Sequence, residues 1–170
     1  MVRSNTRQMK ARKSFSLIEL IIVVAIIELV FYGISLAYYK NFSQEKILGV
    51  EAEKVSDVLG LARTKTLAAD LTPKTGCTDF NGYQVEFSGN DFILVFCCSA
   101  SCTGLDRVVV SSYSLPGTET FLSSSTVMFK PPIGQTDTTT ITIKDSVINK
   151  CYQVMVSASG LVDTIKSICP

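Results

Sequence analysis

Two carboxylates interrupt an otherwise apolar stretch near the start of this sequence, and their chemistry needs an explanation. Glu19 and Glu28 are the only charged residues between Phe15 and Tyr39. About 20 helical residues suffice to span a bilayer, and a carboxylate in hydrocarbon needs a cationic partner or a proton. The pattern therefore predicts a membrane-spanning helix that carries two polar sites.

The sequence contains no histidine among its 170 residues. This excludes Ser-His-Asp and Cys-His catalysis, histidine-ligated zinc and the usual near-neutral general base. The sequence also has no phosphate-binding loop, no nucleophile elbow and no C-x-x-C redox pair. We therefore expect a protein that is not an enzyme and that needs no cofactor and no metal.

Charge is segregated along the chain, although the net charge is only +1. Residues 1–14 hold five of the 16 Lys and Arg residues and none of the 15 Asp and Glu residues. The rest of the chain is therefore acidic overall. The hydrophobic fraction is 46% and the charged fraction is 18%, below the ~25% that is typical of soluble domains. A basic leader before an apolar segment is the arrangement expected of a membrane-directed protein.

The apolar stretch continues into an amphipathic helix. Six residues recur at steps of three and four, which places them on one face of a helix: Leu48, Ala52, Val55, Leu59, Ala62 and Thr66. Four acidic residues lie off this stripe and are expected to face water: Glu45, Glu51, Glu53 and Asp57. No proline occurs before Pro73. We predict one long helix from about Phe15 to about Asp70.

From residue 71 onward the sequence is typical of short antiparallel strands. Alternation and turn signals place them at residues 83–88, 92–96, 108–113, 126–129, 140–144, 152–156 and 161–165. A helix stripe packed on such sheets gives an α+β fold. The predicted organisation is a leader at 1–14, a transmembrane helix at 15–39, an amphipathic extension at 40–70 and an extracytoplasmic β domain at 71–170.

Residues 1–39 fit three alternatives. The first is a secretory signal peptide cut after Ala37, but the apolar stretch is longer than the usual 7–15 residues and contains two glutamates. The second is a plain single-pass anchor. Its Leu, Ile, Val and Phe residues make insertion feasible despite the acids, yet the two carboxylates would have no role.

The third alternative rests on a resemblance. The segment Lys13-Ser14-Phe15-Ser16-Leu17-Ile18-Glu19-Leu20 resembles the cleavage region of type IV prepilins and pseudopilins. The resemblance implies that a prepilin peptidase cuts the leader at the cytoplasmic face, between Ser14 and Phe15. It also implies that Phe15 becomes N-methylated. Glu19 then occupies the fifth mature position, where the family's glutamate is thought to pair with the N-terminal amine of a neighbouring subunit during filament assembly.

Two residues depart from the family pattern. Ser14 replaces the usual glycine before the cut; a small residue still fits the protease subsite, and slow processing is the alternative. Glu28 occupies a place where the family often has a small residue, and nine helical steps of 100° put it opposite Glu19. Either Glu28 faces a polar spot or is protonated in lipid, or it makes a second contact between subunits.

The C-terminal part is similar to the GspH/FimT group of minor pseudopilins and minor type IV pilins. The similar elements are the segment Phe129–Gly134, the strand from Thr138 to Lys144, and a final hairpin with the turn Ser157-Ala158-Ser159-Gly160. The resemblance implies a structural subunit of a type II secretion pseudopilus or a type IV pilus. The alternatives are a major type IV pilin and an extracytoplasmic binding domain on an uncleaved anchor.

The resemblance also implies a location and partners. The chain would cross the bacterial inner membrane once, with its C-terminal domain outside, and would later enter a pilus or pseudopilus. Its partners would be the prepilin peptidase, other pilin or pseudopilin subunits, the inner-membrane assembly platform, and membrane lipid before assembly. DNA is an unlikely partner, because phosphate binding requires clustered cations and the C-terminal tail offers only Lys150 and Lys166.

Six cysteines lie in the predicted extracytoplasmic domain, where disulfides are permitted: Cys77, Cys97, Cys98, Cys102, Cys151 and Cys169. In a hairpin whose turn is centred on Gly89-Asn90, the sequence numbers of two residues paired across the strands add up to 179. In a hairpin centred on Ala158-Ser159 they add up to 317. The second register sets Cys151 opposite about Lys166, close to Cys169, and so predicts a Cys151–Cys169 bridge. The first predicts one or more bridges among the other four cysteines, with Cys77–Cys102 or Cys98–Cys102 favoured. The alternative there is a four-cysteine zinc site, which the absence of a C-x-x-C pair disfavours.

Overall fold

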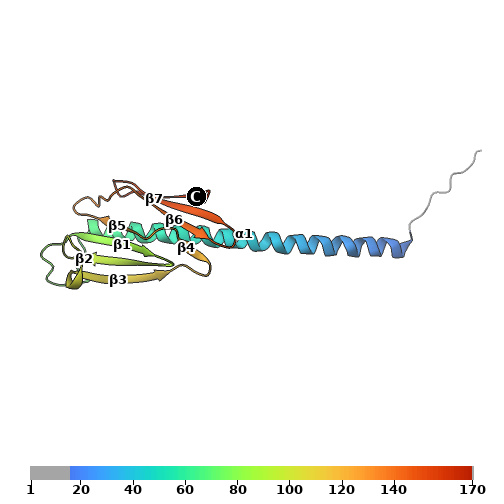
Figure 1. Cartoon of the computed structure of the whole chain (residues 1–170), viewed down its shortest axis with the longest axis horizontal. Helices are drawn as coiled ribbons and strands as arrows, with labels where there is room; N and C mark the ends of the chain where they lie inside the picture. Colours follow the sequence, from blue (N-terminus) through green and yellow to red (C-terminus); the bar gives the residue numbers. More distant parts are fainter. Residues whose placement is uncertain (1–15, 170) are drawn as a thin grey trace, which may run out of the picture. The chain divides into compact units, whose positions relative to one another are not determined.

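A computed structural model describes residues 16–169, apart from the side chains of residues 34–37. The chain divides into two compact units, Met1–Lys40 and Asn41–Pro170. Within the described range the fold is α+β, with one long N-terminal helix and two four-stranded antiparallel sheets (Figure 1). This is the fold class that the sequence predicts.

Helix α1 spans Leu17–Leu67, so it ends three residues before the predicted boundary at Asp70. The termination is local. Ala69 adopts a left-handed φ of 46°, its N–H donates to the carbonyl of Thr66, and the N–H of Asp70 donates to the carbonyl of Lys65. This is a Schellman motif, which satisfies carbonyls that the last helical turn leaves free.

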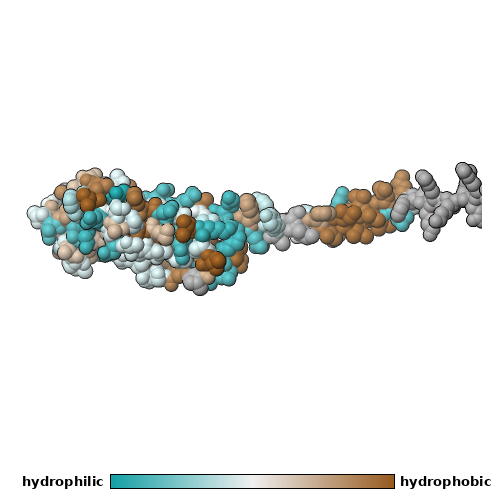
Figure 2. All heavy atoms as spheres, turned by 90° about the horizontal axis from the view of Figure 1, so that it is seen from above, coloured by the Kyte–Doolittle hydropathy of each residue, from teal (hydrophilic) through white to brown (hydrophobic). Residues whose placement is uncertain are grey.

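The part of α1 in the first unit exposes its apolar side chains. The large apolar residues from Leu17 to Tyr32 are 44–77% exposed, and Figure 2 shows hydrophobic side chains gathered along this stretch. Among the described residues, α1 is the one helix long and apolar enough to cross a membrane, by length and composition. Such a helix, followed by a disulfide-bonded domain, indicates a membrane-anchored extracytoplasmic domain.

The second unit contains the rest of α1 and two sheets. The first sheet has the strand order β3-β2-β1-β5 and the second has the order β4-β6-β7-β8. The strands of the first sheet are β1 (Gly82–Ser88), β2 (Asp91–Cys97), β3 (Arg107–Ser114) and β5 (Ser125–Phe129). Those of the second are β4 (Glu119–Phe121), β6 (Thr139–Asp145), β7 (Lys150–Val156) and β8 (Val162–Ser167). A short 3-10 helix, η1 (Gly104–Asp106), precedes β3. The sequence indicates every strand except β4, because three residues are too few to show a period of two.

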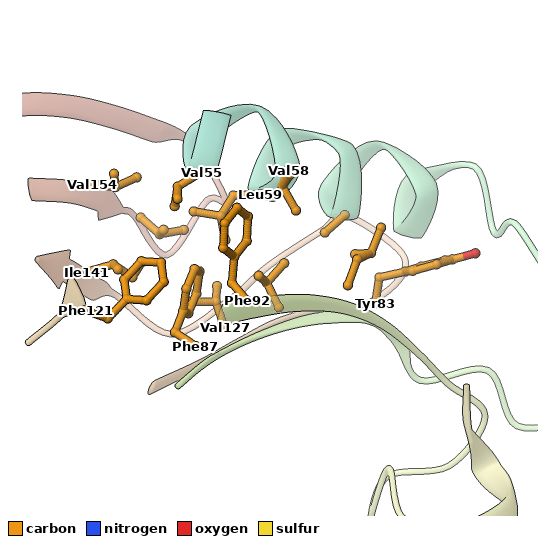
Figure 3. Packing of buried hydrophobic residues seen from close by; sticks show 14 of the residues in the cluster. Val55, Val58, Leu59, Tyr83, Phe87, Phe92, Phe121, Val127, Ile141 and Val154 are labelled. Atoms are coloured by element: carbon orange, nitrogen blue, oxygen red, sulfur yellow. The ribbon is translucent and has the colours of Figure 1, made fainter. Parts of the chain in front are cut away.

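The core lies between α1 and the two sheets. All six residues of the predicted helix stripe, from Leu48 to Thr66, are at most 1% exposed, so the stripe is confirmed. Figure 3 shows side chains of α1 directed at the aromatic and branched residues of the strands. Phe121 packs against Phe87 and Phe92, with ring centroids 5.0 and 5.8 Å apart. Residues of both sheets and the helix therefore share one hydrophobic core.

The registers of the two hairpins test the positions that the sequence pairs. Gly82 pairs with Cys97, as the sum of 179 predicts. In the last hairpin, however, Cys151 pairs with Ser167 rather than with Lys166. The predicted register is wrong by one residue because strand pairing stops at Val156 and Val162. The five-residue turn between them is centred on one residue, not on a peptide bond.

Candidate functional site

The apolar part of α1 carries the two carboxylates that the sequence singles out. Glu19 lies in the first turn of the helix, and both Glu19 and Glu28 are exposed in the isolated chain. Nine residues at 100° each place Glu28 on the opposite face from Glu19, about 13.5 Å further along the axis. The structure therefore does not bring the two acids together, and one partner cannot serve both.

The predicted cleavage and methylation site lies outside the described residues. Ser14 and Phe15 precede the described range, as does the leader. The helix begins immediately afterwards, where the carbonyl of Ser16 accepts hydrogen bonds from the N–H groups of Glu19 and Leu20 at 3.0 and 3.2 Å. Glu19 therefore lies in the first turn of α1, at the positive end of the helix dipole, where an acidic side chain is stabilising.

Glu45 attaches the beginning of the second unit's helix to the second sheet. Its carboxylate accepts hydrogen bonds from the ammonium groups of Lys150 on β7 and Lys166 on β8. These two hydrogen bonds lower the pKa of Glu45 to about 2. The prediction that Glu45 simply faces water is wrong, because the sheet brings two cations to it from residues more than 100 positions away.

A buried carboxylate on β4 is the site residue that the sequence does not reveal. Glu119 is 2% exposed, and its Oε2 atom has no hydrogen-bond partner among the described residues. Burial raises the pKa of Glu119 to about 7, and the nearby charges of Glu51 and Asp145 add to this effect. Asp145, which pairs with Glu119 across β4 and β6, is itself satisfied by the N–H groups of Val147 and Ile148.

The surroundings of Glu119 also correct the prediction for Glu51. The sequence places Glu51 in water, but its side chain is only 13% exposed and forms an ion pair with Lys54 at 3.0 Å. A cavity of about 150 Å³ beside Glu119 is lined by residues that include Ile47 and Pro116. The only signal in the sequence is the alternation of Glu119 and Phe121 with Thr120, which is too short to indicate a buried strand.

Replacing Glu119 with glutamine should make the protein less sensitive to pH between about 4.5 and 7. The folded state holds the proton of Glu119 up to a pKa of about 7, whereas the unfolded state releases it near the ordinary glutamate pKa of 4.5. The contribution of Glu119 to the free energy of unfolding is therefore fully present below about pH 4.5 and is lost as the pH rises through 7. The loss is on the order of 3 kcal/mol.

The measurement is thermal unfolding of the detergent-solubilised chain at pH 5 and pH 8. Glu119→Gln should show a smaller decrease in melting temperature from pH 5 to pH 8 than the wild type. Glu53→Gln is the matched control, because Glu53 is exposed on α1 and its removal should leave the pH dependence unchanged. Identical pH profiles for the wild type and Glu119→Gln would show that Glu119 is not buried as an unpaired acid.

The six cysteines form three disulfides. Cys151 is bonded to Cys169, Cys77 to Cys98, and Cys97 to Cys102, and no described cysteine is free. The first is the pair that the hairpin register indicates. The favoured pairs Cys77–Cys102 and Cys98–Cys102 are wrong, and the two remaining bridges instead use the adjacent residues Cys97 and Cys98 separately.

The reason for this pairing is the alternation of side chains along β2. Successive residues of a strand point to opposite faces of the sheet. Cys97 belongs to a small cluster with Val95 and Cys102, whereas Cys98 belongs to the main core, against which Cys77 packs. Cys102 follows a turn in which its N–H donates to the carbonyl of Ser99 at 3.1 Å, so it returns to the face of Cys97. The predicted register does not reach Cys77, because β1 begins at Gly82.

Compared with known proteins, this chain matches no protein family, no curated protein and no solved structure. The likeness to pilin subunits therefore rests on the architecture: a long N-terminal helix, apolar and exposed in its first part, whose second part packs on antiparallel sheets.

Proposed function

We propose that this chain is a structural subunit of a type IV filament system. It serves either as a minor pseudopilin of a type II secretion pseudopilus or as a minor pilin of a type IV pilus. The observation that carries the proposal is the contrast within α1. Its first part exposes large apolar side chains together with Glu19, whereas the stripe from Leu48 to Thr66 is buried against the sheets. The protein would thus act by assembly and not as an enzyme.

The exposed apolar side chains need a non-aqueous environment. Burying one Val, Leu, Ile or Phe side chain stabilises by about 1.5–3 kcal/mol. Between Leu17 and Tyr32 these exposed side chains are interrupted only by Glu19, Ala25 and Glu28. Membrane lipid would provide this environment first. The helices of other subunits would replace the lipid after the inner-membrane assembly platform extracts the chain into a filament.

Glu19 supplies the specificity of the proposed assembly. Cleavage by a prepilin peptidase would leave Phe15, with an N-methylated amine, as the first residue, and Glu19 would pair with the amine of a neighbouring subunit. Where water is excluded, the pair is specific, because removing either partner leaves the other charge buried and unpaired. The three disulfides support an extracytoplasmic β domain, and we place the chain in the bacterial inner membrane before assembly.

N-terminal sequencing of the membrane-extracted protein tests the proposal directly. We expect the mature chain to begin at Phe15, because the prepilin peptidase would cut after Ser14. A chain that begins at Tyr38 would instead show that residues 1–37 are a secretory signal peptide that has been removed. A chain that retains Met1 in cells that express the peptidase would be an anchored domain, and the filament proposal would fail.

The residue before the cut offers a matched pair of variants. Ser14→Gly restores the residue that the prepilin family usually has there, so the fraction of chains that begin at residue 15 should rise or remain complete. Ser16→Gly makes the same change just beyond the cut and should have no comparable effect. An increase with Ser16→Gly but not with Ser14→Gly would place the cleavage site elsewhere.

A further inference from the structure

Glu28 is exposed on α1, and among the described residues no other part of the chain covers it. Between Leu17 and Tyr39 the sequence contains two carboxylates and no lysine or arginine. Leader cleavage supplies one amine per subunit. In a membrane that contains this chain alone, one carboxylate per subunit would therefore find no cation within the apolar segment. This count rests on the proposed function, because it assumes that the segment is inserted and cut.

One neighbouring helix cannot satisfy both acids. Glu19 and Glu28 point in opposite directions from the axis of α1 and lie about 13.5 Å apart along it. A packed helix lies 8–10 Å away on one side only. The neighbour that approaches Glu28 must therefore be a different helix from the one that provides the amine for Glu19.

The surface around Glu28 is suited to close packing of a polar partner. Ala25 lies three residues before Glu28, so a small side chain adjoins the carboxylate and permits close approach of another helix. Tyr32 lies four residues after it and is 69% exposed, with a hydroxyl group that can join the same polar contact. Val24 and Phe31, 44% and 65% exposed, provide the apolar flanks.

A second copy of this chain cannot supply the cation in the membrane. The first basic residue after the apolar segment is Lys40, twelve residues beyond Glu28. That separation is about 18 Å along a helix. Copies inserted to the same depth would keep Lys40 at a different level of the bilayer from Glu28, and an unpaired carboxylate in the hydrocarbon is costly.

We propose that Glu28 binds a lysine or arginine in the transmembrane helix of a different subunit, at the level of Glu28 in the bilayer. The pair forms before extraction into the filament and brings this chain to its non-identical neighbour. Glu19 then remains free for the amine of the other neighbour. This assigns the chain to a mixed position in the filament, not to a run of identical subunits.

The test uses the full chain in phosphatidylcholine–phosphatidylglycerol vesicles and two synthetic probes. One probe is an apolar single-span helix with a lysine at its centre, and the other is identical except for leucine at that position. Association is measured by fluorescence energy transfer. We expect the wild type to bind the lysine probe about tenfold more tightly than the leucine probe, the size of effect that a polar contact between membrane helices gives.

Two variants assign the effect to one face of the helix. Glu28→Gln, which keeps the shape of the side chain, should bind both probes equally, whereas Glu19→Gln should keep the wild-type preference. The proposal is overturned if the wild type does not distinguish the probes, if Glu19→Gln is the variant that loses the preference, or if the wild type prefers its own copies to the lysine probe. The N-terminal residue, determined on the same preparation, reports separately on leader cleavage.

Discussion

Replacing Glu19 with leucine should remove this chain from assembled filaments while leaving leader cleavage and the β domain intact. The variant would leave the amine of a neighbouring subunit unpaired in the apolar filament core, and loss of one partner of a buried ion pair costs roughly 3–5 kcal/mol. The amount recovered with sheared filaments or in cross-linked complexes should therefore fall by more than about tenfold. The domain should not change, because Glu19 lies in the first unit and the core lies in the second.

Two further variants separate charge from position. Glu19→Gln keeps the shape of the side chain but removes the charge, so it should also assemble poorly. Glu53→Gln removes an exposed acid from the second part of α1 and should assemble normally. Recovery of Glu19→Leu in filaments at the wild-type level would mean that Glu19 does not pair with an amine. The N-terminal residue of each variant must be checked, because a retained leader would block assembly for another reason.

Removing the Cys77–Cys98 disulfide should cost about 3 kcal/mol of the free energy of unfolding. The bridge closes a loop of 21 residues, and the entropy that such a loop removes from the unfolded chain corresponds to roughly that value. The bridge also attaches the segment between α1 and β1 to the main core. The double variant Cys77→Ala/Cys98→Ala should therefore melt at a lower temperature than the wild type.

The matched control is Cys97→Ala/Cys102→Ala, which opens a loop of only five residues and should cost less, about 2 kcal/mol. Counting thiols in the denatured, unreduced protein tests the pairing itself. Both double variants should contain no free thiol, because each removes a complete bridge. In contrast, Cys77→Ala/Cys102→Ala should leave two free thiols, at Cys97 and Cys98. Two free thiols in either of the first variants would refute the pairing.

The sequence determines the helix and most strands because local patterns encode them. The spacing of Leu48, Ala52 and Val55 defines a buried stripe whatever packs against it, and all three are fully buried. The strands near Val85 and Ile141 alternate with a period of two, and the structure places both in sheets. Glu19 and Glu28 are conspicuous for a similar reason, because charge is rare in an apolar segment.

The surroundings of a residue cannot be predicted from local patterns when they are formed by residues distant in the sequence. Glu45 is acidic and lies off the helix stripe, so the sequence predicts a solvated side chain. In the structure, however, β7 and β8 bring Lys150 and Lys166 to its carboxylate. Glu119 lies in a three-residue strand whose burial depends on α1 and β6. The sequence near Glu45 gives no sign of its two lysine partners, and the alternation around Glu119 is too short to indicate a buried strand.

The sequence by itself determined an α+β chain with an apolar N-terminal helix, two carboxylates in that helix, and six cysteines in the domain that follows. These features depend on residue type and on spacing along one element. Only the tertiary structure decided that Cys97 and Cys98 form disulfides with different partners and that Glu119 is buried. It also decided that Glu45 on α1 forms ion pairs with lysines of β7 and β8. The physical reason is that the Cys77–Cys98 bridge, the burial of Glu119 and the contacts of Glu45 each require residues from separate elements to meet. The chain path after β2 decides which face of the sheet Cys102 reaches, and no local pattern of residues encodes it.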